Sequence, residues 1–181
     1  MIETYHLTKK YGNTVAVDDL NLTVRPGELF GFLGPNGAGK TTTIRMLTGL
    51  LRPTSGTARV AGHDILGETL QVKASIGYLA ENPFMYDKLS GREFLRFVAD
   101  LYRVEEAGRE QHINRLLELF ELADKGDDLI GSYSRGMRQK IGLCSVLVHN
   151  PQILFLDEPT TGLDPRSARL VPDPIPVAGS H

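Results

Sequence analysis

A glycine-rich run that ends in lysine and threonine restricts the fold of this chain more than any other feature. It reads Gly34-Pro35-Asn36-Gly37-Ala38-Gly39-Lys40-Thr41-Thr42, and its first eight residues match the pattern G-x-x-x-x-G-K-[ST]. Glycines let the backbone curl until successive N–H groups point at one anion. We expect Lys40 to supply a positive charge for terminal phosphates and the Thr41 hydroxyl to bind Mg²⁺. The run therefore predicts a phosphate-binding loop, with ATP and Mg²⁺ as its ligands.

The residues on either side of this loop have the pattern that such a loop needs. Leu29–Leu33 is an apolar run between two glycines, which predicts a strand that leads into the loop. Lys40–Leu47 is predicted to be a helix that stops near Gly49, a typical C-terminal glycine. The positive end of that helix would point at the phosphates. A glycine-rich turn that matched by accident would not need this strand–loop–helix context, which indicates an α/β fold.

Two acidic residues follow another short apolar run, Ile153–Leu156, which is predicted to be a buried strand. Asp157 ends the strand, where a carboxylate can hold Mg²⁺ in sites of this kind. Glu158 comes next and could orient or deprotonate an attacking water. The alternative is a pair of surface acids at the end of a strand. The preceding phosphate-binding motif favours the metal and catalytic roles.

Hydrophobic periodicity divides the rest of the chain into a strand-rich first third and a helical middle third. Short strands are predicted at Asn21–Val24, Thr57–Val60 and Ser75–Leu79. Ser90–Glu93 has the pattern of a capping box, and apolar residues recur at helical spacing after it. A second helix is predicted around Ile113–Phe120, and a third from Ser134 to just before Asn150.

Composition bounds the remaining possibilities. The chain has 181 residues, 41% of them hydrophobic and 23% charged, which is typical of one globular domain. The formal net charge of −2 gives no basic excess, so no nucleic-acid partner is expected. Cys144 is the only cysteine and lies in an apolar run, which predicts a buried thiol and no internal disulfide. No apolar run is long enough to span a bilayer, so we expect a cytoplasmic protein.

With these motifs the chain resembles the nucleotide-binding domain of ABC transporters, and bacterial exporter-type subunits in particular. The resemblance covers Met1 to Leu170. It implies an α/β P-loop NTPase core of the ABC type, with an N-terminal β-subdomain and an inserted α-helical subdomain. The implied core is 1–82 with 151–170, the helical subdomain is 83–150, and 171–181 is a proline-rich tail.

The resemblance assigns roles to further residues. Tyr11 matches the aromatic residue that stacks on adenine, although a half-buried strand tyrosine is the alternative. Ser134 and Gly136 match part of the signature motif, which faces the γ-phosphate bound by the opposite subunit; Ser134 also fits a helix N-cap. Glu81 stands where the family usually places a Mg²⁺-contacting glutamine, and its alternative is a solvated loop acid.

The resemblance also implies partners. It predicts a head-to-tail homodimer or pseudo-dimer of ATP-binding domains and a separate membrane-spanning permease. The expected function is to couple Mg-ATP binding and hydrolysis to transport, with the protein peripheral on the inner face of the cell membrane. The family's C-terminal core strands and histidine have no counterpart after Leu170, so we expect a C-terminally truncated relative. Two alternatives stay open: a non-catalytic remnant, and a soluble ABC-type ATPase that acts on ribosomes or DNA.

Overall fold

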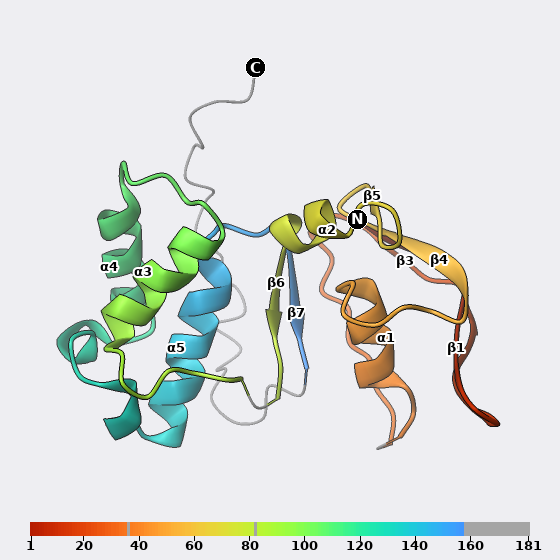
Figure 1. The fold of residues 1–181 in the computed structure, drawn as a ribbon, viewed down its shortest axis with the longest axis horizontal. Helices are drawn as coiled ribbons and strands as arrows, with labels where there is room; N and C mark the ends of the chain where they lie inside the picture. Colours follow the sequence, from red (N-terminus) through yellow and green to blue (C-terminus); the bar gives the residue numbers. More distant parts are fainter. Residues whose placement is uncertain (36, 82, 158–181) are drawn as a thin grey trace. The chain divides into compact units, whose positions relative to one another are not determined.

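The computed structural model describes residues 1–35, 37–81 and 83–157. The described chain forms two compact units. The first contains Met1–Tyr78 together with Gln152–Asp157, and the second contains Leu79–Pro151. Figure 1 shows the ribbon, with labels on most of the helices and strands.

The first unit is built on an antiparallel sheet. Four of its strands lie in the order β2 (Thr14–Leu20), β1 (Ile2–Tyr11), β4 (Ser55–Val60) and β5 (His63–Asp64), and β3 (Thr23–Val24) pairs with β1. Leu7, Ala58 and Val60 are fully buried on this sheet. They contribute to one hydrophobic core with residues of α1 and β7. One face of the sheet therefore packs against α1 and β7 in the core of the first unit.

Two helices and a second, smaller sheet complete the first unit. Helix α1 covers Lys40–Leu47 and helix α2 covers Thr69–Ser75. Strands β6 (Ile76–Leu79) and β7 (Ile153–Leu156) pair side by side (Figure 1). The prediction of α1 is confirmed, and Gly49 adopts φ 68 just after it. Helix α2 was not predicted from the sequence, and Ser75 belongs to it rather than to the following strand.

The predicted strand at Leu29–Leu33 is not present. No strand is assigned there, and Leu29 and Leu33 are 91% and 96% exposed. An apolar run becomes a strand only when a neighbouring strand takes up its backbone hydrogen bonds. Within the described residues, no strand pairs with this segment. The predicted strand Asn21–Val24 is also shorter than expected, because only Thr23–Val24 pairs with β1.

The second unit is helical, as predicted. Its helices are α3 (Gly91–Leu101), α4 (Arg109–Leu119) and α5 (Arg135–Leu147), with short 3₁₀ turns at η1 (Ala123–Lys125) and η2 (Ile130–Ser132). The capping box at the start of α3 is confirmed. Cys144 is buried, and burial raises the pKa of its thiol well above the ordinary value. His112 is buried too.

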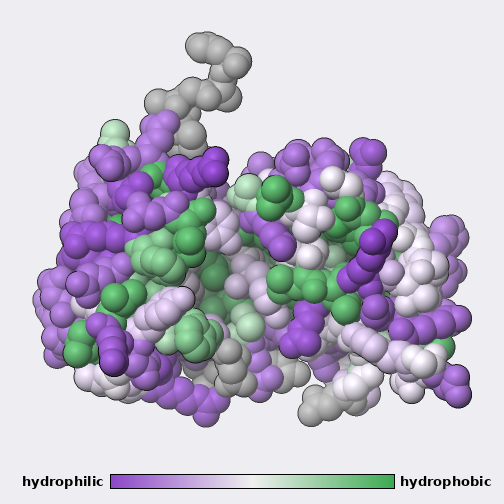
Figure 2. All heavy atoms as spheres, in the orientation of Figure 1, coloured by the Kyte–Doolittle hydropathy of each residue, from purple (hydrophilic) through white to green (hydrophobic). Residues whose placement is uncertain are grey.

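Hydrophobic residues reach the surface in both units, between hydrophilic ones (Figure 2). In the second unit the rings of Phe84, Tyr86 and Phe97 form a chain of edge-to-face contacts with centroids 5.4 Å apart, and all three are exposed. Over the ranges that the structure describes, no helix combines the length and the apolar character needed to cross a membrane.

Candidate functional site

Strand β2 approaches the end of the glycine-rich loop closely at Gly39. Gly39 precedes α1 with φ 81, a left-handed conformation that favours glycine. A Cβ atom on Gly39 would lie 2.2 Å from the carbonyl oxygen of Ala16 on β2. Gly37 also has a positive φ, of 84. The loop therefore needs glycine at residue 39 for both its dihedral angle and its packing against β2.

Lys40 lies against the loop that precedes it. Its Nζ atom donates hydrogen bonds to the carbonyl oxygens of Gly34, at 2.6 Å, and Pro35, at 3.0 Å. The N–H of Ala38 donates to the same Pro35 oxygen at 3.2 Å. Gly34, Pro35 and the glycine at 37 are exposed to solvent. The loop thus presents a fixed positive charge and a solvent-accessible backbone, which suits an anionic ligand.

Among the residues that the structure describes, no side chain caps the first turn of α1. Gly39 has no side chain to accept from the helix N–H groups, and no acidic residue stands in the first turn. The N–H groups at a helix start have no partners inside the helix, and they carry the positive end of the helix dipole. A phosphate is a suitable acceptor for them. Thr42 is half-buried in this turn.

The structure brings Thr41 and Asp157 together, although 116 residues separate them. The Thr41 hydroxyl donates a hydrogen bond to Oδ1 of Asp157 at 2.9 Å. Asp157 follows β7 directly and is only 7% exposed. A hydroxyl and a carboxylate side by side are hard oxygen donors, the kind that Mg²⁺ prefers. These residues therefore fit the predicted metal site.

Tyr78 on β6 also contacts this carboxylate, and the sequence did not single it out. Its hydroxyl donates to Oδ2 of Asp157 at 3.5 Å. Burial, and then the Asp157 charge, raise the pKa of Tyr78 above its usual value of 10.0, while Arg45 opposes the shift. The hydroxyl is therefore protonated at neutral pH and can donate. The signal available in the sequence was a tyrosine in a predicted strand, but the pairing of that strand with β7 was not predictable from local pattern.

Tyr11 is open to solvent at the end of β1. Its side chain is 51% exposed, and Nζ of Lys9 lies 5.3 Å from the ring centroid. Lys9 also donates to the carbonyl oxygen of Arg52 at 2.7 Å, which holds the ammonium in place. β1 and β2 pair up to Tyr11 and Thr14. An exposed ring of this kind can stack on a base.

The remaining predicted site residues lie elsewhere. Ser134 caps α5 by accepting from the N–H of Met137 at 3.3 Å, so its N-cap role is present. Gly136 is exposed, and a Cβ there would meet nothing within 4 Å. Glu81 is exposed as well. These three belong to the second unit, and their roles at a nucleotide stay predictions. Asn36 and Glu158 lie outside the described residues.

The chain belongs to the ABC transporter ATP-binding family, because the family model described as "ABC transporter" matches residues 17–161. It is 43% identical over 173 residues to the ABC transporter ATP-binding protein YhcH of Bacillus subtilis, covering 96% of this chain and 56% of that protein. It is 46% identical over 172 residues to the daunorubicin/doxorubicin resistance ATP-binding protein DrrA of Streptomyces peucetius, covering 95% and 52%. The chain thus spans about half the length of the curated relatives it matches.

Solved structures show the same fold. An ATP-binding subunit of an ABC transporter superposes with a TM-score of 0.84 at 30% identity, covering 93% of this chain and 70% of that one. The cbiO1 protein of Clostridium perfringens, described as part of the ABC transporter complex cbiONQ, gives a TM-score of 0.78 at 26% identity, covering 93% and 69%. The predicted α/β fold of the ABC type is therefore confirmed.

Proposed function

We propose that the chain is the nucleotide-binding part of an ABC transporter, which couples Mg-ATP binding and hydrolysis to transport through a separate permease. The observation that carries this proposal is the 2.9 Å contact between Thr41 and Asp157 beside an uncapped helix start. It joins a phosphate-binding loop to a metal-binding carboxylate from a distant part of the sequence. The alternative, that Asp157 is a surface acid at the end of a strand, does not explain its burial or its contact with Thr41.

Each part of the site has a role in the proposal. The loop Gly34–Thr42 holds the phosphates with its N–H groups and Lys40. Thr41 and Asp157 hold Mg²⁺, which neutralises charge on the phosphate oxygens when it is bound. Tyr11 stacks on the adenine. Glu158 activates the attacking water as a general base.

The partners are part of the same proposal. The chain pairs head to tail with a second ATP-binding domain, and Ser134 and Gly136 approach the nucleotide of that partner. Residues 1–82 and 151–170 form the core and 83–150 the helical subdomain, which docks on the permease at the inner face of the membrane. The names of the relatives as ATP-binding proteins, and of cbiO1 as part of a transporter complex, support this assignment. The resistance named for DrrA favours an exporter.

Titration of a fluorescent ATP analogue tests the site. The unaltered chain should bind the analogue, and Lys40→Ala should abolish binding because the fixed charge for the terminal phosphates is lost. Lys73→Ala is the matched control, since Lys73 is an exposed lysine on α2 in the same unit. Equal affinities in all three proteins would refute the assignment of the loop.

A second candidate is a chain that binds nucleotide without turnover. Leu29 and Leu33, directly before the loop, are almost fully exposed, and this favours it, because a segment without a strand partner among the described residues gives the loop weak support on one side. Steady ATP hydrolysis that Glu158→Gln abolishes, with nucleotide binding retained, would exclude this candidate. Binding with no hydrolysis in the unaltered chain would favour it.

A further inference from the structure

The two oxygens of the Asp157 carboxylate have different partners on different elements. Oδ1 accepts from Thr41 on α1 at 2.9 Å, and Oδ2 accepts from Tyr78 on β6 at 3.5 Å. Asp157 itself follows β7, which pairs with β6. Each carboxylate oxygen therefore faces a hydroxyl group, closely on the Thr41 side and at a longer distance on the Tyr78 side.

Tyr78 is suited to hold a carboxylate in one orientation. Its ring packs against the hydrophobic core of the first unit, so the hydroxyl stands at the end of a stiff side chain. Arg45 acts on the same hydroxyl, and it lies one helical turn after Thr41 on α1. Thr41 and Tyr78 thus reach the two oxygens of Asp157 from different elements, α1 and β6.

Metal-binding carboxylates commonly depend on such outer partners. A carboxylate can rotate about its bonds, and a hydrogen bond to the oxygen that faces away from the metal fixes the other oxygen toward it. Losing the outer partner typically weakens metal affinity about 10- to 100-fold while leaving the direct ligands in place.

We propose that Tyr78 is a positioning residue, which orients the Asp157 carboxylate so that Oδ1 faces the Thr41 hydroxyl and the Mg²⁺ site. This inference rests on the proposed function. In this proposal Tyr78 acts through Asp157, the residue that its hydroxyl contacts.

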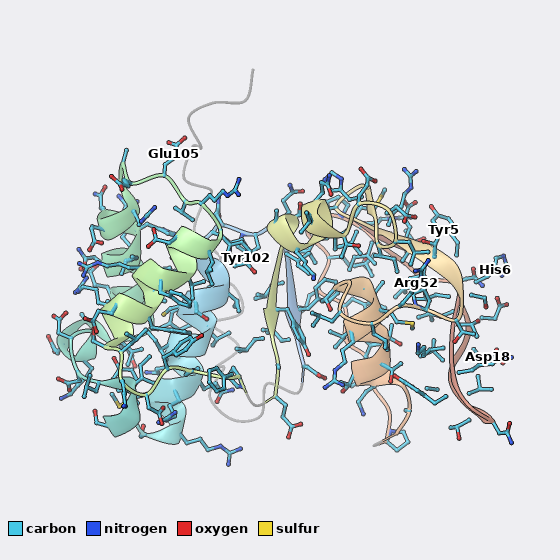
Figure 3. The ribbon with its side chains drawn as sticks, viewed as in Figure 1. Tyr5, His6, Asp18, Arg52, Tyr102 and Glu105 are labelled. Atoms are coloured by element: carbon cyan, nitrogen blue, oxygen red, sulfur yellow. The ribbon has the colours of Figure 1, made fainter. Side chains whose placement is uncertain are left out.

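The test is a Mg²⁺ titration of the full chain in the presence of a fluorescent ATP analogue, read as binding. In excess EDTA, Tyr78→Phe should bind the analogue within about twofold of the unaltered chain, because the loop and Lys40 are intact. The Mg²⁺ concentration for half-maximal tightening should rise about 10-fold or more. Tyr5→Phe is the matched control: Tyr5 lies on β1 in the same unit, is 45% exposed, and is labelled in Figure 3.

Several results would overturn the inference. One is an unchanged Mg²⁺ midpoint in Tyr78→Phe; another is an equal loss of affinity with and without Mg²⁺, which would mean a general loss of structure. If Tyr78→Phe fails to fold, Arg45→Gln replaces it, and it should shift the midpoint in the same direction by a smaller factor; no shift would overturn the inference. Nucleotide binding that is insensitive to Mg²⁺ in the unaltered chain would overturn it while leaving phosphate binding by the loop intact. No nucleotide binding at all would overturn both.

Discussion

Helices α1 and α3 begin in opposite ways. At α3 the Ser90 side chain accepts from the N–H of Glu93 at 3.2 Å, and the Glu93 carboxylate accepts from the N–H of Ser90 at 2.8 Å. At α1 the residue before the helix is Gly39, which offers no side chain. In α3, side chains of the first turn thus accept hydrogen bonds from backbone N–H groups of Ser90 and Glu93. In α1, no side chain of the described residues caps the first turn, so its N–H groups can donate to a ligand. The difference separates a helix start that stabilises the fold from one that is suited to function.

The largest effect is expected from Gly39→Ala compared with Gly108→Ala. Both glycines precede a helix, with φ 81 and 82, so each substitution should cost about 1–2 kcal/mol for the left-handed conformation. Only at Gly39 does the new Cβ meet a neighbour, the Ala16 carbonyl oxygen at 2.2 Å; at Gly108 it meets nothing within 4 Å. Urea unfolding should show the greater loss of stability in Gly39→Ala, and nucleotide titration should show lost binding in that variant alone. Equal losses of stability would show that the approach of β2 does not fix the loop.

Thr41→Val should give the next largest effect. It removes the hydroxyl that contacts Asp157 but keeps the shape of the side chain, so the Mg²⁺-dependent part of nucleotide affinity should fall by about 10-fold or more. Thr69→Val on α2 is the matched control, because it removes a hydroxyl that donates to the carbonyl oxygen of Ile65. Calorimetric titration with Mg-ATP should distinguish the two. A Thr41→Val protein with full Mg²⁺-dependent affinity would contradict the metal site.

Ser90→Ala should affect only stability. Loss of this cap should lower the free energy of unfolding by about 1 kcal/mol, because the N–H groups of the first turn of α3 lose their acceptor. Nucleotide affinity should stay unchanged, as measured by the same titration. A fall in affinity would contradict the separate roles of the two helix starts.

The smallest effect is expected for the pH dependence of stability that His112 gives to the second unit. Burial lowers the pKa of His112 below its usual 6.5, and within the described residues its Nε2 atom has no hydrogen-bond partner. The folded state therefore favours the neutral ring, and the unfolded chain binds the proton more readily. The contribution of neutral His112 to the free energy of unfolding should be fully present above pH 6.5. It should fall as the pH drops below 6.5 toward the pKa of His112 in the folded state. Denaturant unfolding at several pH values should show this fall, and His112→Gln should reduce it.

The parts of the fold with local signals were predictable from the sequence. The capping box at Ser90 and the glycine at 49 mark helix ends by side-chain chemistry within a few residues, and both predictions are confirmed. The prediction of a strand at Leu29–Leu33 was wrong, because a strand needs a partner strand, and the local sequence pattern does not show whether one is present. Helix α2 was missed, since its seven residues include only one buried side chain, Val72, and show little periodicity.

In the candidate site, too, residues with a local sequence signal were predicted, and a residue whose role depends on strand pairing was not. The loop was predicted from its motif spacing and Asp157 from its place at the end of an apolar run. The structure places Thr41 against Asp157, and their roles at a nucleotide stay predictions. Tyr78 was not identified, because its contact with Asp157 depends on the pairing of β6 with β7, which lie far apart in the sequence. Motif residues can be recognised one by one, whereas the residues that orient them are found only when the strands are placed.

The most direct measurement is a thermal melt of the unaltered chain with Mg-ATP, with ATP in EDTA, and with neither. A ligand at 100 times its Kd stabilises the folded state by about 2.7 kcal/mol, which should raise Tm by several degrees. We expect the largest rise in Tm with Mg-ATP, a smaller one with ATP in EDTA, and none for Lys40→Ala under any condition. A melt that is the same with and without Mg-ATP would contradict the claim that the start of α1 and the Thr41–Asp157 pair bind a nucleotide.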